Sequence, residues 1–133
     1  MGRQVILDTN VLIDYEIGAL DRAALDEDDL AIAAITVAEY RTGIELADSP
    51  ERAATRARAL AAIQENVTVL PYTEATAAHQ AELLAFIRRS GRRRGAHDLI
   101  IAAHAKQTGR LLLSRDVAAR FAGLPGVAAE TPV

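Results

Sequence analysis

Short apolar runs alternate with longer stretches of helical periodicity along this chain. The runs of strand length lie at residues 4–7, 30–35, 67–70 and 111–113, and a last apolar segment at 127–129 is a candidate fifth strand. Strands that alternate with helices favour a parallel sheet covered by helices on both faces. The pattern therefore predicts an α/β fold with a central parallel sheet of four to five strands.

The helical stretches are bounded by recognisable start and stop signals. Ser49 is placed to cap a helix over residues 49–64, because Pro50 occupies the first helical position and Glu51 the first turn. Thr9 is the expected cap of the first helix. The remaining helices are predicted at 36–46, 73–89 and 96–107, with a short one around Val117–Phe121. No repeat, low-complexity segment or linker interrupts the pattern, so we expect one domain over residues 1–133.

Composition narrows the class of protein. The 133 residues include no cysteine, which excludes disulfides, a thiol nucleophile and a thiolate metal site. The net charge of −3 argues against a broad basic surface for nucleic acid but leaves room for a local basic patch. Neither a signal peptide nor an apolar stretch of membrane-spanning length is visible. A cytoplasmic protein without a membrane segment is expected.

Four acidic residues come from four separated segments of the predicted sheet and helices. Asp8 follows the first strand directly, and Asp116 follows the fourth strand after two residues. Glu39 and Asp98 are each expected in the first turn of a helix. In open parallel sheets, ligands bind beyond the carboxyl ends of the strands. We therefore expect the four carboxylates to converge at that edge.

Converging carboxylates repel one another unless protons or a cation intervene. Oxygen ligands without cysteine or histidine partners select Mg²⁺ or Mn²⁺ rather than zinc. Such an ion acidifies a bound water and polarises phosphate oxygens, which is the chemistry of metal-dependent phosphodiester hydrolysis. The acids thus indicate a catalytic metal site.

Each acid also has a structural interpretation. Glu39 lies three residues after Thr36, which is the spacing of a capping box. Asp98 suits the positive end of a helix dipole, and Asp116 suits a helix cap. Asp8 is the hardest to explain in this way, since an isolated charge at the end of a buried strand is costly.

Three segments carry a resemblance to a known family. They are VILDTNVLID, ITVAEYRTGI and AHDLIIAAHAKQTGRLLLSRDVAARFAGLPGV, in this order along the chain. With them the sequence resembles the PIN domain, and specifically the VapC-type toxin ribonucleases of bacterial toxin–antitoxin pairs. The resemblance implies a three-layer α/β/α fold. It also implies an RNA substrate, a VapB-like antitoxin partner, a Mg²⁺ or Mn²⁺ cofactor and a homodimer.

The resemblance also assigns roles to single residues. Asp8, Glu39, Asp98 and Asp116 match the family's four acids, and Asp8 with Asp98 match the positions most directly associated with magnesium. Asn10 and Ser114 match polar positions near the site, and they would position ligands or the scissile phosphate by hydrogen bonds. The charged segment at 91–97 departs from the family pattern, as does the more distant placement of Phe121.

The arginines of the segment RRSGRRRG are candidates for contact with RNA phosphates, because guanidinium groups bind phosphate well. Arg93 and Arg94 are the nearest to the expected site, while a solvated charged loop is the alternative interpretation. Two other function classes stay open. One is a non-catalytic interaction domain with the same fold. The other is a phosphoaspartyl phosphatase or receiver using Asp8, although Asn10 replaces the second aspartate that such a phosphatase needs.

Overall fold

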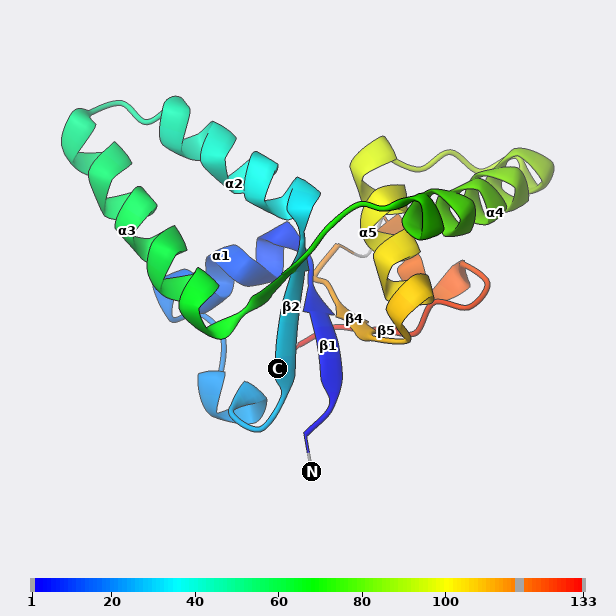
Figure 1. Ribbon diagram of the computed structural model, residues 1–133, viewed down its shortest axis with the longest axis horizontal. Coiled ribbons are helices and arrows are strands. Elements are labelled where there is room, and N and C mark those ends of the chain that lie inside the picture. Colours follow the sequence, from blue (N-terminus) through cyan, green and yellow to red (C-terminus); the bar gives the residue numbers. More distant parts are fainter. Residues whose placement is uncertain (1, 117–118, 133) are drawn as a thin grey trace.

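A computed structural model describes residues 2–116 and 119–132 as a five-stranded parallel sheet with five α-helices (Figure 1). The strands are β1 (Gln4–Leu7), β2 (Asp29–Ala33), β3 (Thr68–Leu70), β4 (Leu111–Leu113) and β5 (Ala129–Glu130). The helices are α1 (Thr9–Ile17), α2 (Ala34–Glu45), α3 (Pro50–Asn66), α4 (Glu74–Ser90) and α5 (Ala96–Thr108). Two 3₁₀ turns, η1 (Arg22–Leu25) and η3 (Phe121–Gly123), complete the described elements. The predicted α/β class is confirmed.

Helices cover the sheet on both faces, with α1, α2 and α3 on one side and α4 and α5 on the other (Figure 1). Successive side chains of a strand point to opposite faces. Val5 and Leu7 of β1 therefore belong to the core under α1 and α3, and Ile6 belongs to the core under α4 and α5. Burial on both faces explains why β1 is a continuous apolar run, and the expected three layers are confirmed.

The strand order β3-β2-β1-β4-β5 sets where a ligand site can form. From β1 the chain moves outward through β2 and β3, then returns to the other side of β1 with β4. The order thus reverses between β1 and β4, which pair through Leu7 and Leu113. This reversal is the topological switch point of an open α/β sheet, where ligands bind beyond the carboxyl ends.

Two predicted helix starts are wrong. Asp8, not Thr9, is the N-cap of α1, because its side chain accepts a hydrogen bond from the Thr9 backbone N–H. The second helix begins at Ala34 rather than at residue 36, since the apolar run at 30–35 supplies both the end of β2 and the first turn of α2. An apolar run of this length does not by itself distinguish strand from helix. Ser49 caps α3 as predicted.

The C-terminal region differs in its details. The short helix predicted around Val117–Phe121 lies partly outside the described residues, and the turn that is described covers Phe121–Gly123. The last strand occupies Ala129–Glu130, two residues later than the predicted start. Within residues 2–116 and 119–132, no helix is long and apolar enough to cross a membrane.

Candidate active site

Asp8 lies at the switch point and is buried, with 5% of its surface exposed. Ser114 Oγ donates a 2.7 Å hydrogen bond to Asp8 Oδ2, and Asn10 Nδ2 donates to the same oxygen at 3.3 Å. The other oxygen, Oδ1, accepts from the Thr9 backbone N–H at 2.8 Å. Both carboxylate oxygens are therefore held in fixed directions at the end of β1.

Ser114 and Asn10 also connect Asp8 to the segment that follows β4. The Ser114 hydroxyl accepts a hydrogen bond from the backbone N–H of Asp116 at 3.0 Å. Asn10 Oδ1 accepts from the backbone N–H of Arg115 at 3.1 Å. The two polar residues predicted near the site are thus in contact with its first acid, and they fix the relative positions of the β1 and β4 ends.

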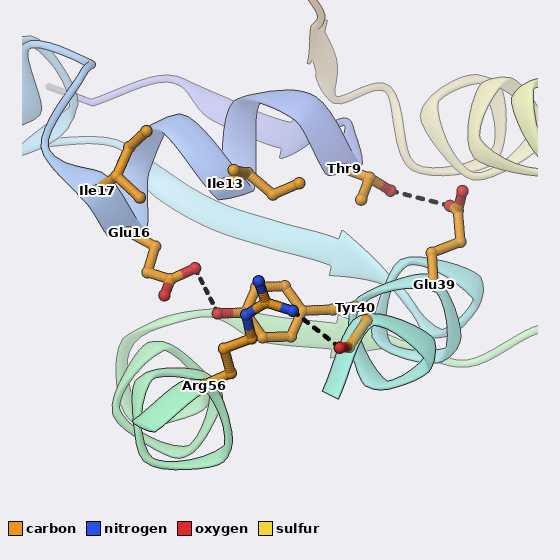
Figure 2. Close-up of a pocket in the computed structure, with 8 residues that line it drawn as sticks. Thr9, Ile13, Glu16, Ile17, Glu39, Tyr40 and Arg56 are labelled. Carbon is orange, nitrogen blue, oxygen red and sulfur yellow. Dashed lines mark hydrogen bonds between the residues drawn. The ribbon is translucent and has the colours of Figure 1, made fainter. Parts of the chain in front are cut away.

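Glu39 comes from α2 and reaches toward the start of α1. Thr9 Oγ1 donates a 2.9 Å hydrogen bond to Glu39 Oε1, as Figure 2 shows. Glu39 Oε2 lies 3.5 Å from His97 Nδ1, at the start of α5. Because α2 begins at Ala34, Glu39 lies in the second helical turn and not in the first, and α2 has no side-chain cap of the kind a Thr36–Glu39 capping box would provide. Glu39 instead bridges α1 and α5.

Asp98 lies in the first turn of α5, as predicted, and its side chain is half-buried. No hydrogen bond to its carboxylate is found among the described residues. A Cβ atom at Gly95 would come within 3.2 Å of Asp98 Oδ2, so the glycine leaves space beside this carboxylate. Asp98 therefore remains available to a ligand.

Asp116 is exposed and follows β4. Its Oδ1 accepts a 3.2 Å hydrogen bond from the backbone N–H of Ala119. This contact agrees with the capping role considered for Asp116. Within the described residues, the other carboxylate oxygen of Asp116 accepts no hydrogen bond, so it is available for a further role.

The four carboxylates affect one another electrostatically. Burial raises the pKa of Asp8, and the charges of Glu39 and Asp116 raise it further, while hydrogen bonds from Ser114 and Thr9 oppose the rise. The pKa of Asp98 is likewise raised by burial and then by the charges of Asp8, Asp116 and Glu39. The acids predicted from the sequence thus share one region of negative potential.

The donor set fits a hard divalent cation that keeps much of its hydration. Over the described ranges, no three histidine, aspartate or glutamate side chains gather closely enough to hold an ion by themselves. Mg²⁺ in proteins is commonly bound through one or two carboxylates and several waters. Asp8, with both oxygens oriented, and Asp98, with none of its oxygens engaged by a described partner, match that need, and a cation would relieve their mutual repulsion.

The two candidate arginines differ in their surroundings. Arg93 is exposed, whereas Arg94 is half-buried and donates from its guanidinium to the backbone carbonyl of Ala119. Sequence reasoning did not identify the contacts of Thr9 with Glu39, of His97 with Glu39, or of Arg94 with Ala119. Each joins segments at least 25 residues apart, so no local pattern signals them.

A hollow of about 280 Å³ opens beside Glu39, between α1, α2 and α3. Its lining combines apolar and charged side chains, among them Ile13, Ile17, Glu16 and Tyr40 (Figure 2). The exposed fractions of Ile13 and Ile17 are 43% and 67%, which is high for isoleucine. The hollow therefore presents an apolar surface that leads to the acidic region.

The comparisons with known proteins agree with this geometry. The family model described as PIN domain matches residues 5–123. Ribonuclease VapC2 of Haemophilus influenzae is 31% identical and ribonuclease VapC5 of Mycobacterium tuberculosis is 34% identical. The alignment with VapC2 covers 84% of this chain and 86% of the relative, and the alignment with VapC5 covers 92% of this chain and 89% of the relative. A solved VapBC-5 toxin–antitoxin structure from Mycobacterium tuberculosis is similar over 98% of both chains, with a TM-score of 0.76 and 32% identity.

Proposed function

We infer that this chain, which belongs to the PIN-domain family, is a divalent-metal-dependent endoribonuclease and the toxin of a toxin–antitoxin pair. The observation that carries the inference is the arrangement of Asp8. It is a buried carboxylate at the switch point, and hydrogen bonds orient both of its oxygens. The charges of Glu39 and Asp116 raise its pKa, and its own charge raises the pKa of Asp98. Asp8 also caps α1, a role that does not need the neighbouring acids.

We assign different roles to the four acids. Asp8 and Asp98 would hold Mg²⁺ or Mn²⁺ directly, while Glu39 and Asp116 would hold water molecules of the site or a second ion. When bound, the ion supplies a polarised phosphate and an acidified water, the chemistry of phosphodiester hydrolysis. Ser114 and Asn10 keep the Asp8 carboxylate oriented. Such supporting hydrogen bonds are a main determinant of metal affinity.

The proposed partner is a small VapB-like antitoxin. Its apolar segment would lie in the hollow lined by Ile13 and Ile17, and a basic residue would then reach Glu39 at the end of the hollow. Toxin–antitoxin pairing of a relative with the same fold supports the proposal, and so does the charge complementarity. We propose a homodimer on the basis of the family resemblance alone. An RNA substrate would place the activity in the cytoplasm.

Cleavage of total RNA by purified, antitoxin-free protein tests the function. With Mg²⁺ or Mn²⁺ we expect discrete fragments, and with EDTA none. Asp8→Asn should abolish the fragments, while Asp26→Asn should not, because Asp26 is an exposed acid in the turn before β2. Circular dichroism verifies that both variants fold. Equal cleavage by wild type and folded Asp8→Asn, or no metal-dependent cleavage, would refute the proposed function.

The non-catalytic alternative gains nothing from the site. Such a domain keeps the fold without the chemistry, yet here the four acids lie at the carboxyl edge and the pKa values of two are raised by the others. The phosphoaspartyl alternative is weakened at the position two residues after Asp8. A phosphatase of that kind needs a second aspartate there, whereas this chain has Asn10, which donates a hydrogen bond to Asp8 Oδ2.

A further inference from the structure

Four arginine side chains line one groove of about 460 Å³ near the proposed metal site. Three of them, Arg92, Arg93 and Arg94, come from the loop between α4 and α5. The fourth, Arg120, comes from the segment before η3. Among the described residues, these four arginines form the lining. A chain whose net charge is −3 thus concentrates positive charge on one small surface, which we call the arginine groove.

The positive charges of the arginine groove are not neutralised by neighbouring acids. None of the four arginines forms an ion pair with a carboxylate within residues 2–116 and 119–132. Burial lowers the pKa of Arg94, and the charges of Arg120 and Arg92 lower it further. Guanidinium groups that crowd one another without counter-charges attract an anion.

Arg94 joins the two walls of the groove. Its guanidinium donates to the backbone carbonyl of Ala119, and a Cβ atom at Gly123 would lie 3.5 Å from its Nη2. The half-buried side chain therefore packs against the segment that carries Arg120. We assign to Arg94 a positioning role, which leaves the exposed Arg92, Arg93 and Arg120 to contact a ligand.

Arg120 has an unusual backbone conformation. Its φ is +49°, and it is the one non-glycine residue with a positive φ among those described. A long side chain in this region is uncommon, and such strain is characteristic of functional sites. Arg120 also lines a second hollow with Ser114 and Asp116, so it lies between the arginine groove and the acids. The negative charge of Asp98 also acts on Arg94, against the lowering of its pKa.

We propose that the arginine groove binds phosphate groups of the RNA strand next to the scissile phosphate, through Arg92, Arg93 and Arg120. Guanidinium groups pair with phosphate in a bidentate geometry. The described lining consists of guanidinium-bearing side chains, which bind a phosphodiester backbone through charge and hydrogen bonds. It therefore contacts the backbone, which contributes affinity and register but not base identity. The proposal rests on the proposed function.

The test is the binding of a labelled single-stranded RNA to antitoxin-free protein that carries Asp98→Asn, so that no cleavage occurs. Arg92→Ala together with Arg120→Ala should weaken binding at least tenfold at low salt. Loss of two phosphate contacts should also lower the slope of log affinity against log salt by about 1.4. Arg52→Ala together with Arg58→Ala is the charge-matched control, since both arginines are exposed on α3, across the sheet from α4 and α5 (Figure 1).

A second pair of variants separates charge from folding. Arg120→Gly relieves the positive φ while it removes the charge, so it should weaken RNA binding and leave the melting temperature unchanged or higher. Arg120→Lys keeps the charge that Arg120→Gly removes, so it should retain most of the salt dependence of RNA binding. Unchanged affinity and slope in the double variant would overturn the proposal, as would absence of RNA binding by the parent protein at low salt.

The outcomes distinguish the groove from the proposed function. If wild type cleaves RNA with metal and the double variant binds RNA unchanged, the groove proposal fails and the nuclease stands. If wild type cleaves no RNA but binding depends on the arginines, the nuclease fails, and only phosphate binding by the groove stands. If the arginine variants bind RNA normally but weaken the antitoxin complex, the groove serves the protein partner and the proposal is overturned.

Discussion

Ser114 Oγ donates a 2.7 Å hydrogen bond to Asp8 Oδ2, and this contact joins the ends of β4 and β1 across the switch point of the sheet. Both residues are buried. A hydroxyl that donates to a carboxylate favours the charged form of the acid, and here it opposes the effect of burial on the pKa of Asp8. The contact therefore sustains the ionised carboxylate that a metal requires.

Ser114→Ala should weaken the site without removing an acid. Loss of the hydroxyl raises the pKa of Asp8 further, so the acid limb of the pH–rate profile of RNA cleavage should move to higher pH. Affinity for Mn²⁺ should fall by about 10- to 100-fold, as for other residues that support metal ligands. Ser90→Ala, which removes an exposed hydroxyl from the end of α4, is the control. An unshifted pH profile with unchanged Mn²⁺ affinity would argue against this role of Ser114.

Asp98→Asn should stabilise the metal-free protein at neutral pH. The folded-state pKa of Asp98 is raised by burial and by three neighbouring acids, so keeping it ionised costs folding free energy. This cost is absent at low pH and appears as the pH rises through the raised pKa. The variant should melt a few degrees higher than wild type at pH 7.5, and the difference should shrink toward pH 4. Thermal unfolding in EDTA at pH 7.5 and at pH 4 measures the two differences in melting temperature.

Added Mn²⁺ should raise the melting temperature of wild type above that of Asp98→Asn. The ion binds the folded wild type and should raise its melting temperature by mass action, whereas Asp98→Asn should respond much less. Asp26→Asn, a change of the same chemistry on an exposed turn, should behave as wild type throughout. An identical Mn²⁺ response of wild type and Asp98→Asn would exclude Asp98 as a ligand.

His104 should make the protein sensitive to acid. It is buried in α5, its Nε2 has no hydrogen-bond partner within the described residues, and burial lowers its pKa. The unfolded state thus binds a proton more readily, so this residue costs stability as the pH falls below about 6.5 toward the lower folded-state pKa. In urea unfolding, His104→Leu should lose less stability than wild type between pH 7 and pH 5. An equal loss of stability in His104→Leu and wild type would contradict this role of His104.

Ile17→Asp should weaken the antitoxin complex and spare the nuclease. Ile17 is 67% exposed and lines the hollow beside α2, so the change should not disturb the core. We expect the dissociation constant of the complex to rise about tenfold or more, because a charge replaces an apolar contact. RNA cleavage by the free variant should match wild type. Normal antitoxin binding would place the partner elsewhere on the surface.

The sequence was sufficient to predict the strands and the placement of Asp8 and Asp116 after two of them, for a physical reason. Buried parallel strands are continuous apolar runs; Asp8 directly follows one of them, and Asp116 follows another after two residues. The predicted starts of α1 and α2 were wrong because the same residues there belong to the signals of two elements. Asp8 is both the N-cap of α1 and a candidate ligand, and Ala34 and Ile35 continue the apolar run of β2 into α2.

The contacts around the acids depend on tertiary packing and had no local signal. Thr9 reaches Glu39 because α1 and α2 start from the same sheet edge. Arg120 joins Arg92 and Arg93 only when the segment after β4 folds against the loop before α5. Its positive φ also has no counterpart in composition or periodicity, since glycine or asparagine is the usual residue there.

The most direct measurement of the metal-dependent site is the rate of cleavage of one defined RNA as a function of Mn²⁺ concentration. Wild type, Asp8→Asn, Glu39→Gln, Asp98→Asn, Asp116→Asn and the control Asp26→Asn would be compared. The four site variants should lose about 100-fold or more in rate or require much higher Mn²⁺, and the control should retain wild-type behaviour. Wild-type rates at unchanged Mn²⁺ in folded Asp8→Asn and Asp98→Asn would contradict a catalytic metal site at this edge of the sheet.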